Sequence, residues 1–422
     1  MTLLDTTPGA AAADRLNSLD VEAVRRDFPI LHQEVHGHPL VFLDSAASAQ
    51  KPRQVIDAIS HCYEAEYANI HRGVYHLSER ATTNFEAARA TVQKFLGAKE
   101  TREIVFVRGG TEGINLVASS YGGMAVQEGD EIVLSTLEHH ANIVPWQLLA
   151  ERTGARIRVI PVNDAGELIM EEYEKLLGPR TRIVAVTHAS NALGTITPIE
   201  EIIRLAHAAG AKVLVDGCQG AVHMEVDVQA MDCDFYVFSG HKLYGPSGIG
   251  ALYGKAELLE AMPPYQGGGE MISRVTFEKT TYADIPARFE AGTPAIADAI
   301  GLQAAIDYVT GLGLDRIAAH EHELLVRATE RLGEIDGLTF YGQAKDKASI
   351  VSFLIDGCHP HDAGTVFDHE GVSVRAGHHC AQPVMDRFDV SGTVRASFGL
   401  YNTLDEIEAL ARAVEKAKEM FG

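Results

Sequence analysis

The sequence has few basic residues and few cysteines, and each shortage excludes a class of protein. Its 36 lysines and arginines face 58 aspartates and glutamates, so the formal net charge is −22 at pH 7. A nucleic-acid partner is therefore not expected, because such proteins carry basic faces that neutralise phosphates. The five cysteines are odd in number and include no Cys-x-x-Cys pair, which argues against a disulfide framework and a zinc finger.

Long apolar runs are also missing. No run approaches the ~18 apolar residues of a membrane span, so no membrane partner is expected. Residues 1–14 lack the basic start and apolar centre of a signal peptide, and we expect them to form a disordered leader. Together with the unpaired cysteines, these features make a reducing cytoplasm the simplest location.

Short apolar runs alternate with helical segments through the first part of the chain. This alternation predicts an α/β fold with a mostly parallel, doubly wound sheet and helices on both faces. The expected strands are residues 104–107, 131–135, 156–160, 182–187, 212–216, 235–239 and 250–253.

The pattern changes beyond about Pro294, where two long helical stretches lead into shorter strands and a final helix. We expect a smaller α+β domain there, including strands at 349–355, 372–375 and 393–398. The predicted division is a large domain over residues 39–294, a small C-terminal domain over residues 295–422, and an N-terminal segment, residues 15–38, that packs with the small domain.

Polar residues follow the predicted strands, at the edge of the sheet where ligands bind in doubly wound folds. A glycine-rich turn at residues 108–113 opens a helical segment, so its backbone N–H groups suit a phosphate. Each residue alone has a simpler explanation as a cap, a turn or a core histidine. Together they form a coherent set: Thr111, His139, Asn191, Asp216, Gln219, Ser239, His241 and Lys242.

Lys242 lies just past the strand at 235–239, in a glycine-rich turn. It is either a solvated loop lysine or an amine held in a pocket as a Schiff-base nucleophile. Asp216 closes a neighbouring predicted strand and favours the second reading. Pyridoxal phosphate needs a lysine to hold its aldehyde and a carboxylate to pair with its ring nitrogen.

Several segments together resemble one family. They are residues 43–48, 69–73, 111–115, 138–142, 239–242, 289–294 and 375–380, and they span nearly the whole chain. The chain resembles class V aminotransferase-fold enzymes, and most closely the SufS-type (group II) cysteine desulfurases. The resemblance implies the fold type I of pyridoxal-phosphate-dependent transferases, with a seven-stranded, mostly parallel sheet in the large domain.

The resemblance also implies an activity. The enzyme would convert L-cysteine to L-alanine, leave a persulfide on Cys380 and supply sulfur for iron–sulfur cluster assembly. Lys242 would carry the cofactor and move the substrate's α-proton, and His139 would stack on the cofactor ring. The phosphate and ring contacts would come from Gly110, Thr111, Asp216, Gln219, Ser239 and His241, with Thr293 reaching in from the partner subunit of a homodimer.

The substrate pocket and the sulfur acceptor are implied in the same way. Arg395 would grip the substrate carboxylate, and the other implied substrate contacts are Asn191, Arg375, Ala46 and His71. His361 matches a histidine that, in enzymes working with a zinc-containing SufU acceptor, takes over a zinc ligand during sulfur transfer. A SufU-type acceptor is therefore expected rather than a SufE-type one, and a plain solvated loop histidine stays the alternative reading.

The sequence leaves other points open. No metal site is expected, because His378, His379 and Cys380 are adjacent and adjacent residues rarely converge on one ion. A selenocysteine lyase or cysteine sulfinate desulfinase on the same scaffold remains an alternative activity. A non-enzymatic scaffold is disfavoured by the intact catalytic residues. The chain departs from the family pattern at Gly109-Gly110, where a second threonine is often seen, and at Cys218, where alanine is common.

Overall fold

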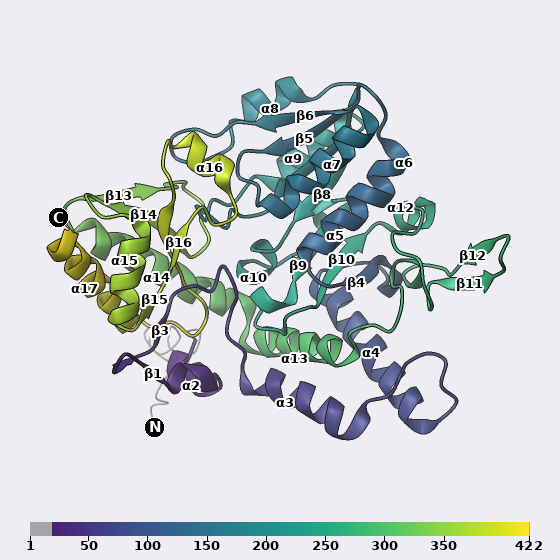
Figure 1. Cartoon of the computed structure of the whole chain (residues 1–422), viewed down its shortest axis with the longest axis horizontal. Coiled ribbons are helices and arrows are strands. Elements are labelled where there is room, and N and C mark those ends of the chain that lie inside the picture. Colours follow the sequence, from purple (N-terminus) through teal and green to yellow (C-terminus); the bar gives the residue numbers. More distant parts are fainter. Residues whose placement is uncertain (1–18, 422) are drawn as a thin grey trace, which may run out of the picture.

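A seven-stranded sheet forms the centre of the computed structural model, which describes residues 19–421 (Figure 1). Its order is β4-β10-β9-β8-β7-β5-β6. Strand β10 pairs antiparallel with β4 and β9, and the other pairs are parallel, so the mostly parallel sheet is confirmed. The strands are β4 (Ile104–Val107), β5 (Glu131–Ser135), β6 (Arg156–Ile160), β7 (Thr181–Thr187), β8 (Lys212–Asp216), β9 (Phe235–Ser239) and β10 (Gly250–Gly254).

The central strands are apolar throughout because both faces of the sheet are covered. Along β7, Val184 and Val186 pack into one hydrophobic cluster, while Ile183 and Ala185 pack into the cluster on the other face. Such strands show continuous apolar runs rather than alternation, which explains why their bounds were readable from the sequence. The covering helices include α4 (His76–Phe95), α5 (Gly110–Val117), α7 (Val144–Thr153), α8 (Met170–Leu176), α9 (Ile199–Ala208), α10 (Gly220–His223) and α12 (Ala256–Ala261).

A four-stranded antiparallel sheet lies to one side of the large sheet, with order β13-β14-β17-β16 (Figure 1). Helix α13 (Ile296–Leu312) packs against α4 and α3 (Arg53–His61) and leads into this part of the chain. Its other elements are α14 (Leu314–Gly333), β13 (Leu338–Tyr341), β14 (Ile350–Ile355), α15 (Pro360–His369), β16 (Arg375–Gly377), α16 (Gln382–Arg387), β17 (Thr393–Ser397) and α17 (Leu404–Phe421).

The single strand expected at residues 372–375 is wrong in one respect, because the chain changes sheets within it. Strand β15 (Val372–Ser373) pairs in parallel with β3 (Val41–Phe42), whereas β16 begins at Arg375 and joins β17. The half-buried Val374 separates the two. This switch carries the chain from its pairing with β3 towards the loop that bears Cys380.

The N-terminal segment contacts the C-terminal part of the chain. Helix α2 (Val21–Arg26) begins after Asp20, whose carboxylate accepts a hydrogen bond from the Ala23 N–H at 3.0 Å. Arg25 donates to the Tyr401 carbonyl at 2.6 Å and pairs with Glu406 at 2.8 Å. The predicted leader, residues 1–14, lies outside the described residues, and the domain division at about residue 294 stays a prediction.

Between residues 19 and 421, no helix has the length and apolar character needed to cross a membrane. A hairpin of β11 (Ile272–Val275) and β12 (Thr280–Tyr282) projects from the body of the molecule (Figure 1). Its tip carries Phe277, whose side chain is fully exposed.

Candidate active site

A cavity of about 490 Å³ lies between the carboxyl ends of the large-sheet strands and the edge of the small sheet. Residues from both sheets line it, which explains why no single segment of the sequence defines it. The expected site residues that line it are Ala46, Gly110, Thr111, His139, Asn191, Asp216, Gln219, Ser239, His241, Lys242, Arg375, Cys380 and Arg395.

Lys242 and Asp216 place opposite charges in this cavity. Lys242 ends the short turn Gly240–Lys242 that follows β9, and Asp216 is the last residue of β8. The Asp216 side chain is buried, and its Oδ1 accepts a hydrogen bond from the Cys218 N–H at 3.0 Å. The lysine amine and the buried carboxylate thus lie at the ends of adjacent strands. They are the two groups that pyridoxal phosphate needs, because an amine binds its aldehyde and a carboxylate pairs with its ring nitrogen.

His139 is neutral and has a defined tautomer. Burial, followed by the charge of Lys242, lowers the pKa of His139 to about 4. Its Nδ1 accepts a hydrogen bond from the Ala141 N–H at 3.0 Å, so the ring proton lies on Nε2. The ring therefore offers a neutral face and one N–H donor to the cavity.

The start of α5 forms an anion cradle. Gly109 ends the turn after β4 with φ of 146°, a conformation that favours glycine, and it lets the chain turn sharply into the helix. The Gly110 N–H donates to Ser239 Oγ at 2.8 Å, and Thr111 lines the cavity beside it. Free N–H groups and the helix dipole suit a phosphate, as do the hydroxyls. Together with Lys242 and Asp216, these donors fit pyridoxal phosphate.

The thiol of Cys218 fills the space that a side chain at position 110 would need. A Cβ atom placed on Gly110 would lie 2.4 Å from Cys218 Sγ, which no real contact allows. Gly110 does not have a positive φ, so the backbone itself would accept another residue. The two departures from the family pattern, the glycine and the cysteine, therefore compensate for each other.

One carboxylate is shared by two arginines on the small-sheet side of the cavity. Asp44 accepts hydrogen bonds from Arg375 Nη2 at 2.7 Å and from Arg395 Nη2 at 3.0 Å. The two guanidiniums therefore keep one uncompensated positive charge. Arg395 is 1% exposed, and its Nε has no hydrogen-bond partner among the described residues. A buried donor of this kind needs an acceptor, and a substrate carboxylate would supply one.

The Cys380 loop is held by its backbone, while its thiol side chain is exposed. His379 and Cys380 both have φ of 54°, a left-handed conformation that is costly for non-glycine residues. The Cys380 carbonyl accepts from the His140 N–H at 2.7 Å, and the His379 carbonyl accepts from Asn191 Nδ2 at 2.6 Å. Contacts to the large sheet thus fix a strained loop of the small sheet.

Two residues expected to contact a ligand, Asn191 and Gln219, already form hydrogen bonds within the chain. The Asn191 amide supports the His379 carbonyl, and the Asn191 backbone carbonyl accepts from Arg395 Nη1 at 2.8 Å. Gln219 Nε2 donates to the Ala46 carbonyl at 2.7 Å, so one amide hydrogen remains for a ligand. Asn191 therefore orients the Cys380 loop and Arg395 in addition to any contact with substrate.

Three expected residues lie outside this cavity. His71 is exposed, with Nε2 3.1 Å from Glu86 Oε1, and Thr293 lines a different hollow of the same chain. His361 lies in the first turn of α15, which packs against β16 and β17. Its neighbour in the next turn, Gly364, faces Ala376, the residue in the middle of β16.

Two residues at the site had no assigned role from the sequence. Asp44 belongs to the segment 43–48 noted there, but its sharing between two arginines depends on a contact across the fold. His140 supports the Cys380 loop twice, through its backbone N–H and through Nε2, which accepts from the Gln382 N–H at 3.1 Å. No local pattern in the sequence identifies either contact.

We predict that the Gly110 and Cys218 positions are coupled. Gly110→Thr should weaken pyridoxal phosphate binding about tenfold or more, because the new side chain overlaps the thiol. Adding Cys218→Ala to that variant should restore binding to within about threefold of wild type, because it removes the overlap. Titration of cofactor-free protein with pyridoxal phosphate measures both, and additive effects of the two substitutions would contradict the coupling.

The buried imidazoles predict a loss of stability in acid. Burial is the largest cause that lowers the pKa of His139 and His241 to about 4 and of His379 to about 3. These imidazoles take up protons near pH ~6.5 in the unfolded chain but only at lower pH in the folded chain. The free energy of unfolding is therefore at its full value above pH ~6.5 and falls as the pH is lowered further. The unfolding midpoint of cofactor-free protein should drop between pH ~6.5 and ~4.

His139→Gln provides the direct test of this pH dependence, because it removes one of the titrating imidazoles. The variant should lose less stability than wild type over the same pH range, as measured by thermal unfolding. His322→Gln is the control, since His322 is exposed on α14 and should leave the pH dependence unchanged. Equal acid sensitivity in His139→Gln and wild type would contradict the account.

Comparisons with known proteins agree with this site. The class-V aminotransferase family model matches residues 41–410. A Synechococcus elongatus protein named cysteine desulfurase is 56% identical over 413 residues, covering 98% of this chain but only 66% of that longer protein. A cysteine desulfurase of Dickeya dadantii is 54% identical over 95% of this chain and 98% of the relative.

A solved structure gives the same result. The cysteine desulfurase CsdA from Escherichia coli superposes with a TM-score of 0.89 at 41% identity, over 96% of this chain and 99% of that one. The chain therefore belongs to the cysteine desulfurase family of class-V aminotransferases, which are enzymes dependent on pyridoxal phosphate.

Proposed function

We propose that the chain is a SufS-type L-cysteine desulfurase that supplies sulfur for iron–sulfur cluster assembly. The observation that carries the proposal is that Lys242 and Cys380, from two different sheets, line one cavity. An amine that can hold a cofactor and move a proton thus shares a cavity with a thiol that can accept sulfur. The exposure of Cys380 favours a persulfide that can be passed on.

The cavity residues divide between cofactor and substrate. Pyridoxal phosphate, when bound, supplies an electron sink next to the substrate's α-carbon. Lys242 would hold it covalently and carry the α-proton, and Asp216 and His139 would contact its ring. Gly110, Thr111, Ser239 and His241 would hold its phosphate, and Gln219 would contact its ring oxygen. Arg395 and Arg375 bind the substrate carboxylate, with Asn191 and Ala46 lining the pocket.

The sulfur transfer needs no oxidant or reductant besides the cysteine substrate and the Cys380 thiol. The Cys380 thiolate attacks the sulfur of bound cysteine, so a sulfur–sulfur bond forms while the carbon–sulfur bond of the substrate breaks. The electron pair of the broken bond stays with the carbon, which takes up a proton and leaves as L-alanine. The net change converts one cysteine and one thiol into one alanine and one persulfide.

A SufU-type acceptor is the proposed partner, because His361 lies on a helix that packs against the strand leading into the Cys380 loop. Helix α15 carries His361 in its first turn and packs against β16, which leads into the Cys380 loop. The side chain is exposed, so it is accessible to a docked protein. A zinc-containing acceptor would gain an imidazole ligand there as its own thiol is freed.

A homodimer in the cytoplasm completes the proposal. Thr293 is exposed and lies away from the chain's own cavity, as a residue that serves a partner's phosphate should. Apolar side chains are also unusually exposed on the hairpin and on the segment before α4, and a second copy would bury them. They include Tyr63, Val74, Tyr75, Val275, Phe277 and Tyr282.

We predict that Cys380→Ser abolishes alanine production from L-cysteine, by at least about a hundredfold, because no thiolate remains to take the sulfur. Selenocysteine turnover should persist in this variant, since selenium can leave without the thiol. Alanine and sulfide release from each substrate are the measurements. Unchanged cysteine turnover in the variant would refute the desulfurase mechanism.

We also predict that His361→Ala leaves basal turnover unchanged but removes most of the stimulation by a zinc-containing SufU protein, about tenfold or more. Alanine production with and without that acceptor measures the effect. The matched control is His322→Ala, an exposed histidine on α14. Full stimulation of His361→Ala, or stimulation by a SufE protein alone, would show that the proposed acceptor is wrong.

A further inference from the structure

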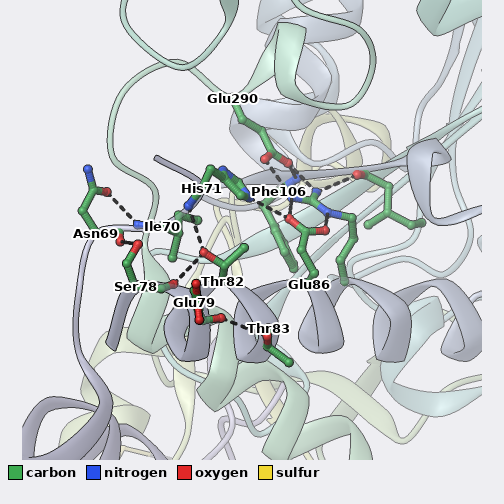
Figure 2. Close-up of polar contacts among 12 residues, drawn as sticks. Asn69, Ile70, His71, Ser78, Glu79, Thr82, Thr83, Glu86, Phe106 and Glu290 are labelled. Atoms are coloured by element: carbon green, nitrogen blue, oxygen red, sulfur yellow. Dashed lines mark hydrogen bonds and ion pairs between the residues drawn. The ribbon is translucent and has the colours of Figure 1, made fainter. Parts of the chain in front are cut away.

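A buried arginine, Arg89 on α4, pairs with two carboxylates, Glu86 and Glu290, outside the cavity that Lys242 lines. Its Nη1 and Nη2 donate to Glu290 at 2.6 and 3.0 Å, and its Nε donates to Glu86 at 2.9 Å. Nη1 also donates to the Ile104 carbonyl at 2.9 Å. Figure 2 shows Glu290, Glu86 and Phe106 gathered in this cluster.

The cluster is well formed but costly to bury. The Arg89 side chain is 3% exposed and that of Glu290 is 10% exposed. Burial would lower the pKa of Arg89, but Glu290 and Glu86 outweigh it and leave that pKa raised, so the charge persists. Such a bidentate, desolvated pair fixes the geometry of both side chains. It adds little to stability, because well-packed apolar residues in its place would stabilise the fold equally. Its geometry therefore points to positioning.

The cluster joins two loops that are far apart in the sequence. On one side, Glu86 Oε1 lies 3.1 Å from His71 Nε2, and the His71 N–H donates to Thr82 Oγ1 at 2.9 Å (Figure 2). His71 has φ of 69°, so its loop is strained and needs such support. On the other side, Glu290 accepts from the Phe106 N–H at 2.7 Å and stands three residues before Thr293.

Each loop carries one residue expected at the site that this chain's own cavity lacks: His71 as a substrate contact and Thr293 as a phosphate contact. His71 and Arg89 line one hollow of about 340 Å³, and Thr293 lines another of about 490 Å³. The two hollows share Glu290, Gly292 and Pro294, so they adjoin. Neither includes Lys242, Asp216 or Cys380. His71 and Thr293 can therefore serve a cofactor site only in another copy of the chain.

We propose that Arg89 is a positioning residue that acts across the subunit interface: it holds the His71 and Thr293 loops in the arrangement that completes the neighbouring subunit's cofactor site. The inference rests on the proposed homodimer with shared sites. It extends that proposal by identifying Arg89 as the buried group that holds the loops of one subunit in the positions needed to complete the site of the other.

Mixed dimers test the direction of this effect. Arg89→Met homodimers should retain pyridoxal phosphate about tenfold more weakly than wild type, because both sites lose the correctly placed loops. In a dimer of one Arg89→Met subunit and one Lys242→Ala subunit, the Arg89→Met subunit should again retain its cofactor. Its intact Lys242 belongs to the Arg89→Met subunit, and the loops that complete that site come from the subunit with Arg89.

The measurement is the fraction of Arg89→Met subunits that carry cofactor after dialysis. Borohydride reduction fixes the cofactor to Lys242, and the mass of each tagged subunit reports it, so no turnover assay is needed. Recovery in the mixed dimer to within about twofold of a wild-type and Lys242→Ala dimer supports the proposal. Persistent loss there, normal retention in the Arg89→Met homodimer, or a monomeric wild-type protein would overturn it.

Two further variants separate positioning from folding. Glu86 is half exposed, and Glu86→Gln preserves the shape of its side chain while weakening its contacts with both His71 and Arg89, so this variant serves if Arg89→Met does not fold. Arg331→Met is the matched control: Arg331 is also bound by carboxylates, Glu408 and Glu415, but lies on α14. Arg331→Met homodimers should retain cofactor normally. Wild-type protein that holds cofactor but makes no alanine would refute the proposed activity alone.

Discussion

The position of the Cys380 loop depends on one carboxylate that serves two arginines. Asp44 follows β3 and faces the small sheet, where it pairs with Arg375 and Arg395 and bridges to Ser397 through the backbone. Because one negative charge faces two positive ones, the arrangement fixes β16 and β17 side by side and still leaves a net positive charge for a substrate carboxylate. The strand that ends in the Cys380 loop is thus held by the same carboxylate that orients the two arginines lining the cavity.

The proposed chemistry asks two conflicting things of Cys380. Its thiol must reach the substrate in a cavity that also holds Lys242, and it must be exposed enough to pass sulfur to another protein. The structure reconciles these demands by fixing the backbone rather than the side chain. His140 and Asn191 hold the carbonyls of Cys380 and His379, while the thiol itself remains exposed. The strained conformation of both residues is maintained by these contacts from the large sheet.

The sequence predicted those parts of the fold and site that depend on local patterns. Strands such as β7 and β8 were readable because they are buried on both faces, and Asp216 and Lys242 were expected to converge because parallel strands end at one edge. The sharing of Asp44, the fit of Cys218 against Gly110 and the sheet switch after Ser373 depend on contacts between distant segments, which no local pattern contains. The position of His71 outside the cavity could not be read from the sequence either.

The central claim is that sulfur from L-cysteine passes to Cys380, and the location of the sulfur tests it most directly. The protein with its cofactor would be treated with L-cysteine, alkylated at once and digested, and the mass of each cysteine peptide would be measured. The account predicts one added sulfur atom on Cys380 and none on Cys62, Cys218, Cys233 or Cys358, of which three are buried and Cys218 lies against Ser239. Added sulfur on another cysteine, or on none while alanine is formed, would contradict it.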